Sequence, residues 1–191
     1  MPRIVVPEQY LAEPATFVHR HYRPELSSAL LQLGLAVYEH TRLPARIVEA
    51  IRVRTAQING CVTCQTWRAE RDLPAVFARR GRDGSGSFLY EGGPLPDADF
   101  YDALGDRWRE ATVFSERERL AIEHAERMGT DPHSFEDASE FWQLMHDHFD
   151  DGEIVDLTIC VAGFIAGGRF LHTLDLDPAV CAFVPAPADM G

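Results

Sequence analysis

The sequence predicts an all-α protein, and three observations support this fold class. Apolar residues recur at helical spacing in several segments of the chain. Ser115 and Glu118 have the spacing of a capping box at the start of one of these segments. No stretch alternates apolar and polar residues over a length that would favour a β-sheet. We therefore expect a helical bundle.

The first two expected helices lie in residues 23–40 and 43–58. In the first, one side carries the apolar residues Leu26, Leu30, Leu33 and Val37. In the second, the apolar positions are Ile47, Val48, Ile51 and Ile58. Asn59-Gly60 follows the second helix, and glycine at this position is a common helix stop. Both segments are thus expected to bury one face.

Three further helices are expected in the second half of the chain. Residues 115–128 begin with the capping box, and residues 134–149 repeat the amphipathic pattern. Residues 152–174 are apolar on nearly every side, which is typical of a central, buried helix. Residues 46–60 and 153–167 also align without a gap, which is compatible with duplication of a helical unit. In that alignment Gly168 and Leu171 stand where the first copy has Cys61 and Cys64.

The whole chain, residues 1–191, is expected to form a single domain. Residues 1–24 mix aromatic side chains with His and Arg and are expected to form an N-terminal arm, which would extend over a neighbouring subunit. Residues 79–99 are rich in Gly, Pro, Ser and Asp and are expected to form a long surface loop. Such a loop is either a lid or interface element, or a tolerated insertion, and the sequence leaves both open.

Composition excludes several classes of function. The chain has 18 basic and 30 acidic residues, a formal charge of −12, which disfavours nucleic acids and anionic membrane surfaces. The most apolar stretch, residues 154–168, is shorter than a membrane span and contains Asp156. The N-terminus has no signal-peptide pattern, and four cysteines do not make a disulfide framework. We expect a cytoplasmic protein, in which a Cys-x-x-Cys pair is catalytic or binds metal.

Cys61 and Cys64 form that pair, directly after the helix stop. If a helix begins after Gly60, Cys61, Cys64 and Arg68 share one face. The helix N-terminus and the charge of Arg68 would then favour the thiolate, moving a cysteine pKa from about 8.5 towards 7. A zinc site is the chemical alternative, but Cys160 and Cys181 do not form a second pair. Inert packing is the remaining alternative, and it is the expected role of Cys160.

The spacing of Glu49 and the cysteine pair resembles a known family. Glu49 lies in one helix, and the Cys-x-x-Cys follows twelve residues later at the start of the next. This arrangement, in "LPARIVEAIRVRTAQINGCVTCQ", resembles the core motif of the alkylhydroperoxidase D / carboxymuconolactone decarboxylase superfamily. The segments "FSERERLAIEHAERM" and "FDDGEIVDLTICVAGFIAGGRF" resemble the helices that follow in that family. The likeness covers much of the chain.

The resemblance implies a fold, an activity and partners. The fold is an all-α bundle that assembles as a dimer, trimer or hexamer, with no cofactor. The activity is that of a peroxidase acting on a small hydroperoxide, or of an oxidoreductase acting on a disulfide. In this role Cys64 attacks the peroxide, Cys61 resolves the product to a disulfide, and Glu49 belongs to a proton relay. A dithiol or lipoyl-type partner then reduces the disulfide.

Arg68 departs from the family pattern, because the relay histidine would lie at this position. Arginine stays protonated and cannot pass on a proton, although it can hold a thiolate or orient Glu49. We therefore expect a slow peroxidase or a thiol–disulfide activity on another substrate. Two alternatives remain open: chemistry of the carboxymuconolactone decarboxylase type, which does not need a cysteine pair, and a non-enzymatic helical oligomer with vestigial cysteines.

Three side chains carry alternative interpretations. Glu49 belongs either to the site or to a surface pair with Arg52, three residues later. His124 either faces the cysteines from the second half of the chain or is an exposed helical histidine. His172 is expected to be a core histidine with its hydrogen bonds satisfied.

Overall fold

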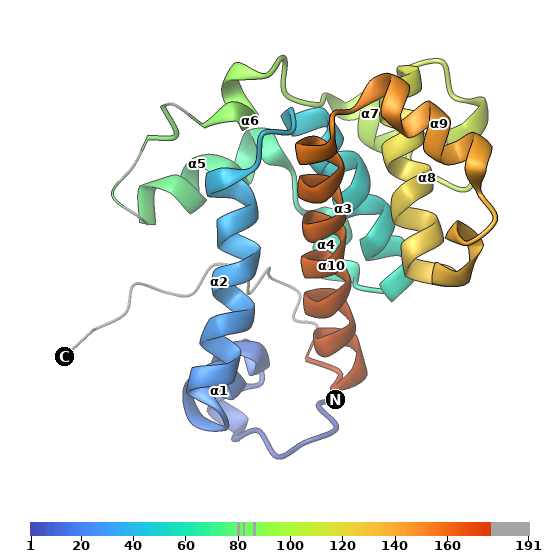
Figure 1. The fold of residues 1–191 in the computed structure, drawn as a ribbon. Helices are drawn as coiled ribbons and strands as arrows, with labels where there is room; N and C mark the ends of the chain where they lie inside the picture. The colour runs from blue at the N-terminus through green and yellow to red at the C-terminus, as the bar shows by residue number, and fades with distance from the viewer. Residues whose placement is uncertain (80, 82, 86, 177–191) are drawn as a thin grey trace.

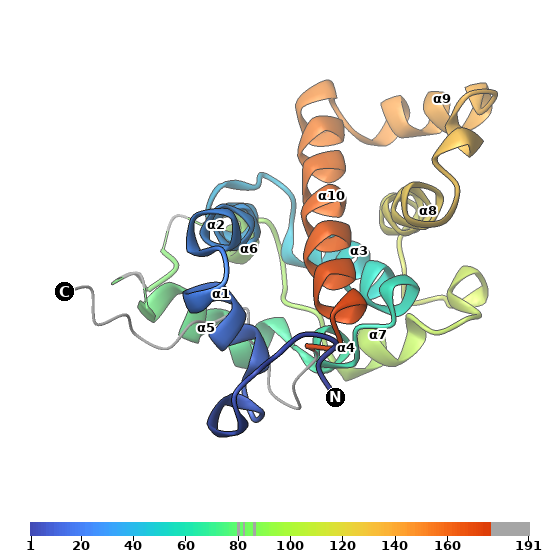
Figure 2. The ribbon, with the colours of Figure 1, turned by 90° about the horizontal axis from the view of Figure 1, so that it is seen from below.

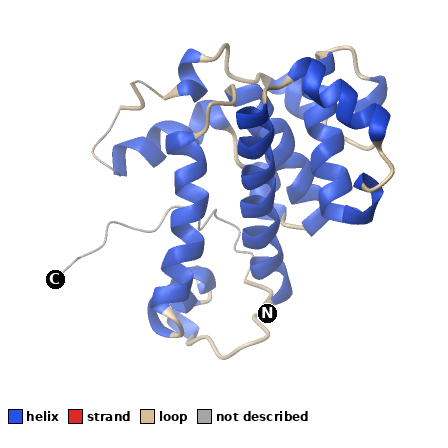
Figure 3. Ribbon diagram, in the orientation of Figure 1, coloured by secondary structure: helices blue, strands red, loops and turns tan. Residues whose placement is uncertain are grey.

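The structure is a computed structural model that describes residues 1–79, 81, 83–85 and 87–176. In this part of the chain the regular elements are helices, and Figure 3 shows no strand among them. The all-α prediction is confirmed. The α-helices are α1 (Pro14–His21), α2 (Pro24–His40), α3 (Ala45–Asn59), α4 (Val62–Thr66), α5 (Ala69–Arg79), α6 (Phe88–Glu91), α7 (Ala98–Ala103), α8 (Glu116–Thr130), α9 (Ser139–His148) and α10 (Asp151–Thr173). Short 3₁₀ turns cover Glu8–Tyr10, Trp108–Glu110 and Pro132–Phe135.

Helix α3 lies at the centre, packed between α8 and α10, and α10 packs on its other side against α2 (Figures 1 and 2). The contact between α3 and α10 buries Ile47, Val48 and Ile51 together with Leu157 and Val161. These five aliphatic side chains belong to the largest buried apolar cluster of the described residues, which also takes in α5, α8 and α9. The pair of central helices is thus held chiefly by burial of apolar surface.

Local capping signals in the sequence agree with the structure. Ser115 caps α8, and its backbone N–H donates in return to the Glu118 carboxylate, so the predicted capping box is confirmed. Glu118 also accepts from Arg46 of α3 at 2.5 Å, which ties the start of α8 to the central helix. Asp150 and Glu153 form a second capping box at the start of α10, which was not predicted from the sequence.

Helix α10 is buried over most of its surface but not all round. The residues facing α3 are buried, but Val155 and Ile159 are exposed. The expectation of a helix buried all round was therefore wrong for this face. At 23 residues α10 is also long and apolar enough to cross a membrane by length and composition alone, a test that core helices pass as well. In this structure α10 packs against α2, α3 and α8.

The apolar stripe of α2 is likewise only partly covered. Val37 is buried against the core, whereas Leu33 is exposed and Leu26 keeps 72% of its surface accessible. The pattern predicted the helix correctly but not the depth of its packing. The N-terminal half of α2 runs beyond the core towards α1, as Figure 1 shows.

The segments expected to form a surface loop and an N-terminal arm both contain helices. Within residues 79–99, α6 buries Leu89, and Ser87 donates to the Tyr38 carbonyl at 3.4 Å, so this part of the segment belongs to the packed body. Residues 1–24 contain α1 and a 3₁₀ turn. This segment lies against the end of α10 in the same chain, with Arg3 N–H donating to the Leu174 carbonyl at 2.9 Å.

The proposed duplication is not settled by the helices themselves. The segments aligned in the sequence fall in α3 and α10, which pack against each other. Helix α3 ends at Gly60, whereas α10 continues past Gly167 to Thr173. Duplication therefore stays a hypothesis.

Candidate functional site

The turn between α3 and α4 places the cysteine pair. Gly60 adopts φ = 69°, a left-handed conformation that glycine tolerates best, and its N–H closes the last turn of α3. A side chain at this position would meet the ring of His172, since a Cβ would lie 3.1 Å from Cε1. Cys61 is then the N-cap residue of α4, and its sulfur accepts from the Cys64 N–H at 3.2 Å. The predicted helix stop and restart are confirmed.

Cys61 and Cys64 are joined by a disulfide, with Cα atoms 5.3 Å apart. The two residues differ in accessibility, because Cys61 is 0% exposed and Cys64 is only half-buried. Cys160 is a free, buried thiol on α10, and burial raises the pKa of this thiol to about 12, consistent with the expected packing role. Cys181 lies outside the described residues.

Arg68 does not lie on the cysteine face. Helix α4 ends at Thr66, and Trp67 is extended at ψ = 144°, so the helical projection made from the sequence fails beyond α4. The Arg68 guanidinium donates to the carbonyls of Gln65 at 2.5 Å and Trp67 at 2.7 Å. It also stacks over the Tyr101 ring at 4.3 Å. Arg68 therefore closes the turn between α4 and α5, and its role beside the Cys64 sulfur stays a prediction that the helical projection no longer supports.

Glu49 and Arg52 form a buried ion pair on α3. Glu49 is 1% exposed and Arg52 is 5% exposed, and the guanidinium holds both carboxylate oxygens at 2.7 and 2.9 Å. The pairing expected at the surface thus exists, but in the interior beside the cysteine turn. Tyr101 of α7 donates its phenol to Glu49 at 2.6 Å and accepts the Ala69 N–H at 3.0 Å.

Arg52 connects the buried carboxylate to the cysteine segment. Its guanidinium donates to the Cys64 carbonyl and, at 3.0 Å, to the Trp67 carbonyl. It also lies over the Trp67 ring at 4.9 Å. Arg52 therefore fixes the backbone on both sides of the α4 end. From the sequence, this residue was considered only as a partner for Glu49, and Tyr101 was missed, although the i, i+3 spacing of the pair was visible.

Ionisation in this group follows from burial and the Glu49 charge. Burial opposes the charge of Arg52, but the Glu49 carboxylate outweighs it and the pKa of Arg52 lies above its ordinary value. Burial, and then the charge of Glu49, raise the pKa of the Tyr101 phenol. At neutral pH the Arg52 guanidinium is therefore charged and the Tyr101 phenol is neutral.

A small pocket of ≈ 40 Å³ opens beside Cys64. Its lining comes from α2, α3, α4, α5, α10 and the α4–α5 turn and is apolar over most of its area. The lining residues are Gly34, Leu35, Tyr38, Arg52, Thr55, Ala56, Cys64, Trp67, Val76, Phe164 and Gly168. One water-sized sphere needs roughly 10–15 Å³, so the pocket admits a molecule of only a few heavy atoms. Its lining thus combines a cysteine and a cation with apolar side chains.

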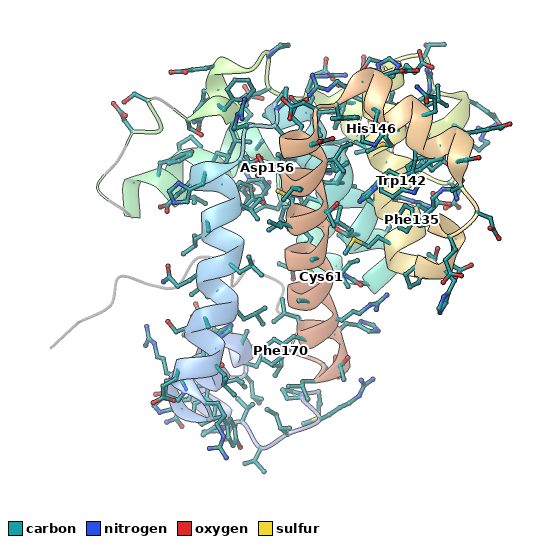
Figure 4. The ribbon with its side chains drawn as sticks, in the orientation of Figure 1. Cys61, Phe135, Trp142, His146, Asp156 and Phe170 are labelled. Carbon is teal, nitrogen blue, oxygen red and sulfur yellow. A yellow bond between two sulfur atoms is a disulfide. The ribbon has the colours of Figure 1, made fainter. Side chains whose placement is uncertain are left out.

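The two histidines considered from the sequence lie elsewhere. His124 is 2% exposed but sits among Phe135, Phe141 and Trp142, with its Nε2 3.2 Å from the Thr158 hydroxyl. Figure 4 shows Phe135 and Trp142 on the side of α8 and α9, away from the labelled Cys61. Both interpretations of His124 were thus wrong, since it neither faces the cysteines nor is exposed. His172 is exposed rather than a core residue, and its ring packs on Gly60.

Metal ligands do not gather at this site. Among the residues that the structure describes, no group of three or more His, Cys, Asp or Glu side chains is placed to hold a metal ion. The site therefore consists of half-buried Cys64, the buried Glu49–Arg52 ion pair and the apolar pocket.

Comparison with solved structures identifies the fold. The structure superposes on a protein of unknown function from Agrobacterium tumefaciens, described as a candidate antioxidant defence protein AhpD, with a TM-score of 0.60. The match covers 84% of this chain and 97% of the other, at 20% sequence identity. The chain has an AhpD-like fold. No family model matches the sequence, and no curated protein matches it either. The AhpD-like fold agrees with the resemblance seen in the sequence motif.

Proposed function

We propose that this AhpD-like protein is a thiol-dependent oxidoreductase in which Cys61 and Cys64 cycle between dithiol and disulfide. The observation that carries the proposal is the pair itself, joined at the start of α4 with Cys64 lining a pocket. The fold likeness supports the same chemistry, because the similar structure is described as a candidate antioxidant protein.

The proposed reaction with a hydroperoxide has two steps. The Cys64 thiolate attacks the terminal oxygen, the O–O bond breaks, and the alkoxide takes a proton to leave as an alcohol. Cys64 is then a sulfenic acid. The Cys61 thiol attacks the Cys64 sulfur, water leaves, and the disulfide seen in the structure forms. A dithiol of the lipoyl class returns the pair to the reduced form and becomes a disulfide itself.

The buried charges are assigned to positioning. Arg52 donates to the Cys64 carbonyl and is the cation bound most directly to this residue among the contacts described. Glu49 contacts Arg52 and Tyr101, which makes it a support for Arg52 rather than a direct partner of the sulfur in the disulfide form. Because arginine does not release its proton, it cannot protonate the alkoxide, and this proton is drawn from solvent. We therefore expect a slow peroxidase.

The pocket favours a small, uncharged, apolar substrate. Most of its lining area is carbon, and the charge of Arg52 is already compensated by Glu49. A charged substrate would lose its hydration on entry without gaining a free partner. A short alkyl hydroperoxide matches both the size and the polarity of the space.

A homo-oligomer remains part of the proposal. Leu33 of α2 packs against Gly163 of α10, and Ile159 lies one helical turn before Gly163. The side chains of Leu33 and Ile159 therefore belong to one surface of the α2–α10 pair. Both are large apolar residues left exposed in the single chain. We propose that a second copy covers this surface, and that the protein works in the reducing cytoplasm, where a lipoyl-type dithiol is regenerated.

Substitution of Cys64 tests the function directly. Cys64→Ser should abolish consumption of a short alkyl hydroperoxide in the presence of a small dithiol, while Cys160→Ser, which alters a buried packing cysteine, should leave it unchanged. Peroxide loss is followed with a ferrous-ion dye assay. Undiminished consumption by Cys64→Ser would remove the basis of the proposal and favour a non-enzymatic role for the pair.

A further inference from the structure

The N-terminal segment of the chain lies over Cys61. The apolar cluster that encloses this sulfur contains Ala15 and Val18 of α1 together with Leu171 and Leu176 at the end of α10. Both α1 residues are buried. We call residues 1–22 the N-terminal cover. Figure 4 shows Cys61 beside α10, with the covering segment and Phe170 towards the lower end of that helix.

The cover is held to the end of α10 by a few polar contacts. Arg3 donates its guanidinium to the Thr173 carbonyl at 2.6 Å and its backbone N–H to the Leu174 carbonyl at 2.9 Å. These carbonyls belong to the last turn of α10, where a cation is favoured. The N-terminal ammonium also binds Asp175 at 2.7 Å. All of these contacts are at the surface, so local opening of the cover requires little of the core to unfold.

The two sulfurs of the disulfide therefore differ in what can reach them. A thiolate attacks a disulfide in line with the S–S bond, from the far side of the sulfur that it attacks. Cys61 is fully buried in one apolar cluster with Val18, Ala15 and Leu171, and Cys64 packs against that cluster while staying partly accessible. Cys64 is half-buried and borders the pocket.

We propose that the N-terminal cover directs thiol–disulfide exchange to Cys64 and, by opening, controls access to Cys61. With the cover closed, one thiolate of a small dithiol attacks the Cys64 sulfur, and the Cys61–Cys64 bond breaks. Cys61 leaves as a thiolate and takes a proton. The second thiol of the reductant then attacks the first sulfur of the same reductant molecule, which is bonded to Cys64 in the mixed disulfide. This step releases Cys64 and yields the cyclic disulfide of the reductant. The inference rests on the proposed function, whose reductive half it specifies.

The cover also disfavours the departure of Cys61. An apolar surrounding destabilises a thiolate relative to the thiol, so the covered sulfur is a poor leaving group until water or a proton donor reaches it. Opening of the cover should therefore accelerate reduction as well as expose the second sulfur. Both effects follow from the same displacement of α1.

The test traps the first mixed disulfide on the oxidised full-length protein. 2-Mercaptoethanol is the probe, since a monothiol cannot complete the second step, and the freed cysteine is captured with a fast alkylating reagent. Fragment mass spectrometry of the peptide between Arg54 and Arg68 then locates the adduct. In the wild-type protein the adduct should lie on Cys64 at least about tenfold more often than on Cys61.

Variants of the cover should change this ratio. Arg3→Ala removes the charge-assisted bonds at the end of α10 and should lower the ratio about tenfold towards equal labelling. Ala15→Asp places a carboxylate in the buried contact with Cys61 and should have the same effect. Arg20→Ala, an exposed change on α1, is the control and should leave the ratio unchanged. Circular dichroism checks that each variant keeps its helices.

The outcomes separate this inference from the proposed function. Comparable adducts on both cysteines of the wild-type protein overturn the inference and leave the redox function standing. The inference is overturned in the same way if neither Arg3→Ala nor Ala15→Asp alters the ratio. If the folded protein forms no adduct on either cysteine, the pair is inert and the proposed function itself fails.

Discussion

Removing Arg52 should destabilise the protein strongly, because this side chain holds a buried charge and two backbone carbonyls. Arg52→Met leaves the Glu49 carboxylate buried at 1% exposure with only the Tyr101 phenol as a partner. It also frees the Cys64 and Trp67 carbonyls, which Arg52 now binds. Breaking a buried ion pair on one side costs about 3–5 kcal/mol, which for a chain of this size is a fall in Tm of roughly 6–20 °C.

The assay is urea unfolding of the oxidised protein, followed by circular dichroism. Arg54→Met on the same helix is the matched control. Arg54 binds Glu126 at 3.1 Å in a more accessible position, and its loss should cost about 1 kcal/mol. The double variant Glu49→Gln/Arg52→Met should cost about 2–3 kcal/mol less than the two single changes added together. A cost below about 1 kcal/mol for Arg52→Met would refute the reasoning.

Three further outcomes are expected. Burial lowers the pKa of His124 from 6.5 to about 4, so as the pH falls the unfolded chain binds a proton at this residue before the folded chain does. The free energy of unfolding should therefore fall by about 3 kcal/mol between pH 6.5 and pH 4. Tm measured across this range should vary less in His124→Gln, and an equal pH dependence in the two proteins would contradict the assignment. Gly60→Ala should cost about 1–2 kcal/mol in urea unfolding because φ is 69°, and an unchanged midpoint would exclude backbone strain. Ile159→Glu should reduce the mass seen by light scattering to that of one chain, whereas Leu144→Glu on α9 should not; a wild-type protein that is already monomeric would refute the proposed interface.

Local signals in the sequence were sufficient for α2, α3, α8, α9 and α10 and for the cysteine turn. Gly60 and the Ser115 capping box act through the backbone within a few residues, so their effects can be predicted without knowing the fold. The position of Cys61 at the start of α4 follows from the helix stop at Gly60.

The positions of Arg68 and Arg52 could not be obtained in the same way. Nothing between Cys64 and Arg68 is a helix breaker, yet α4 ends at Thr66 because Trp67 turns into the core and its carbonyl is bound by Arg52. That contact joins residues on two helices, so it depends on tertiary packing. The helical projection therefore misplaced Arg68 and did not reveal the bond between Arg52 and the Cys64 carbonyl.

The depth of burial was the second quantity that periodicity did not provide. Leu26 and Val37 belong to the same predicted stripe, but only Val37 meets the core. An apolar stripe shows that a face is suited to contact and does not show what covers it. His124 illustrates the converse, since a polar residue of an ordinary amphipathic helix is enclosed by three aromatic rings.

A single-turnover reaction of the reduced protein with a short alkyl hydroperoxide tests the central claim most directly. Equimolar peroxide is added, and the intact mass and the positions of the remaining thiols are measured. The account predicts the loss of two hydrogen atoms per chain, located at Cys61 and Cys64, with one alcohol formed and Cys160 still reduced. An unchanged mass, or oxidation that spares this pair while peroxide is consumed, would contradict it.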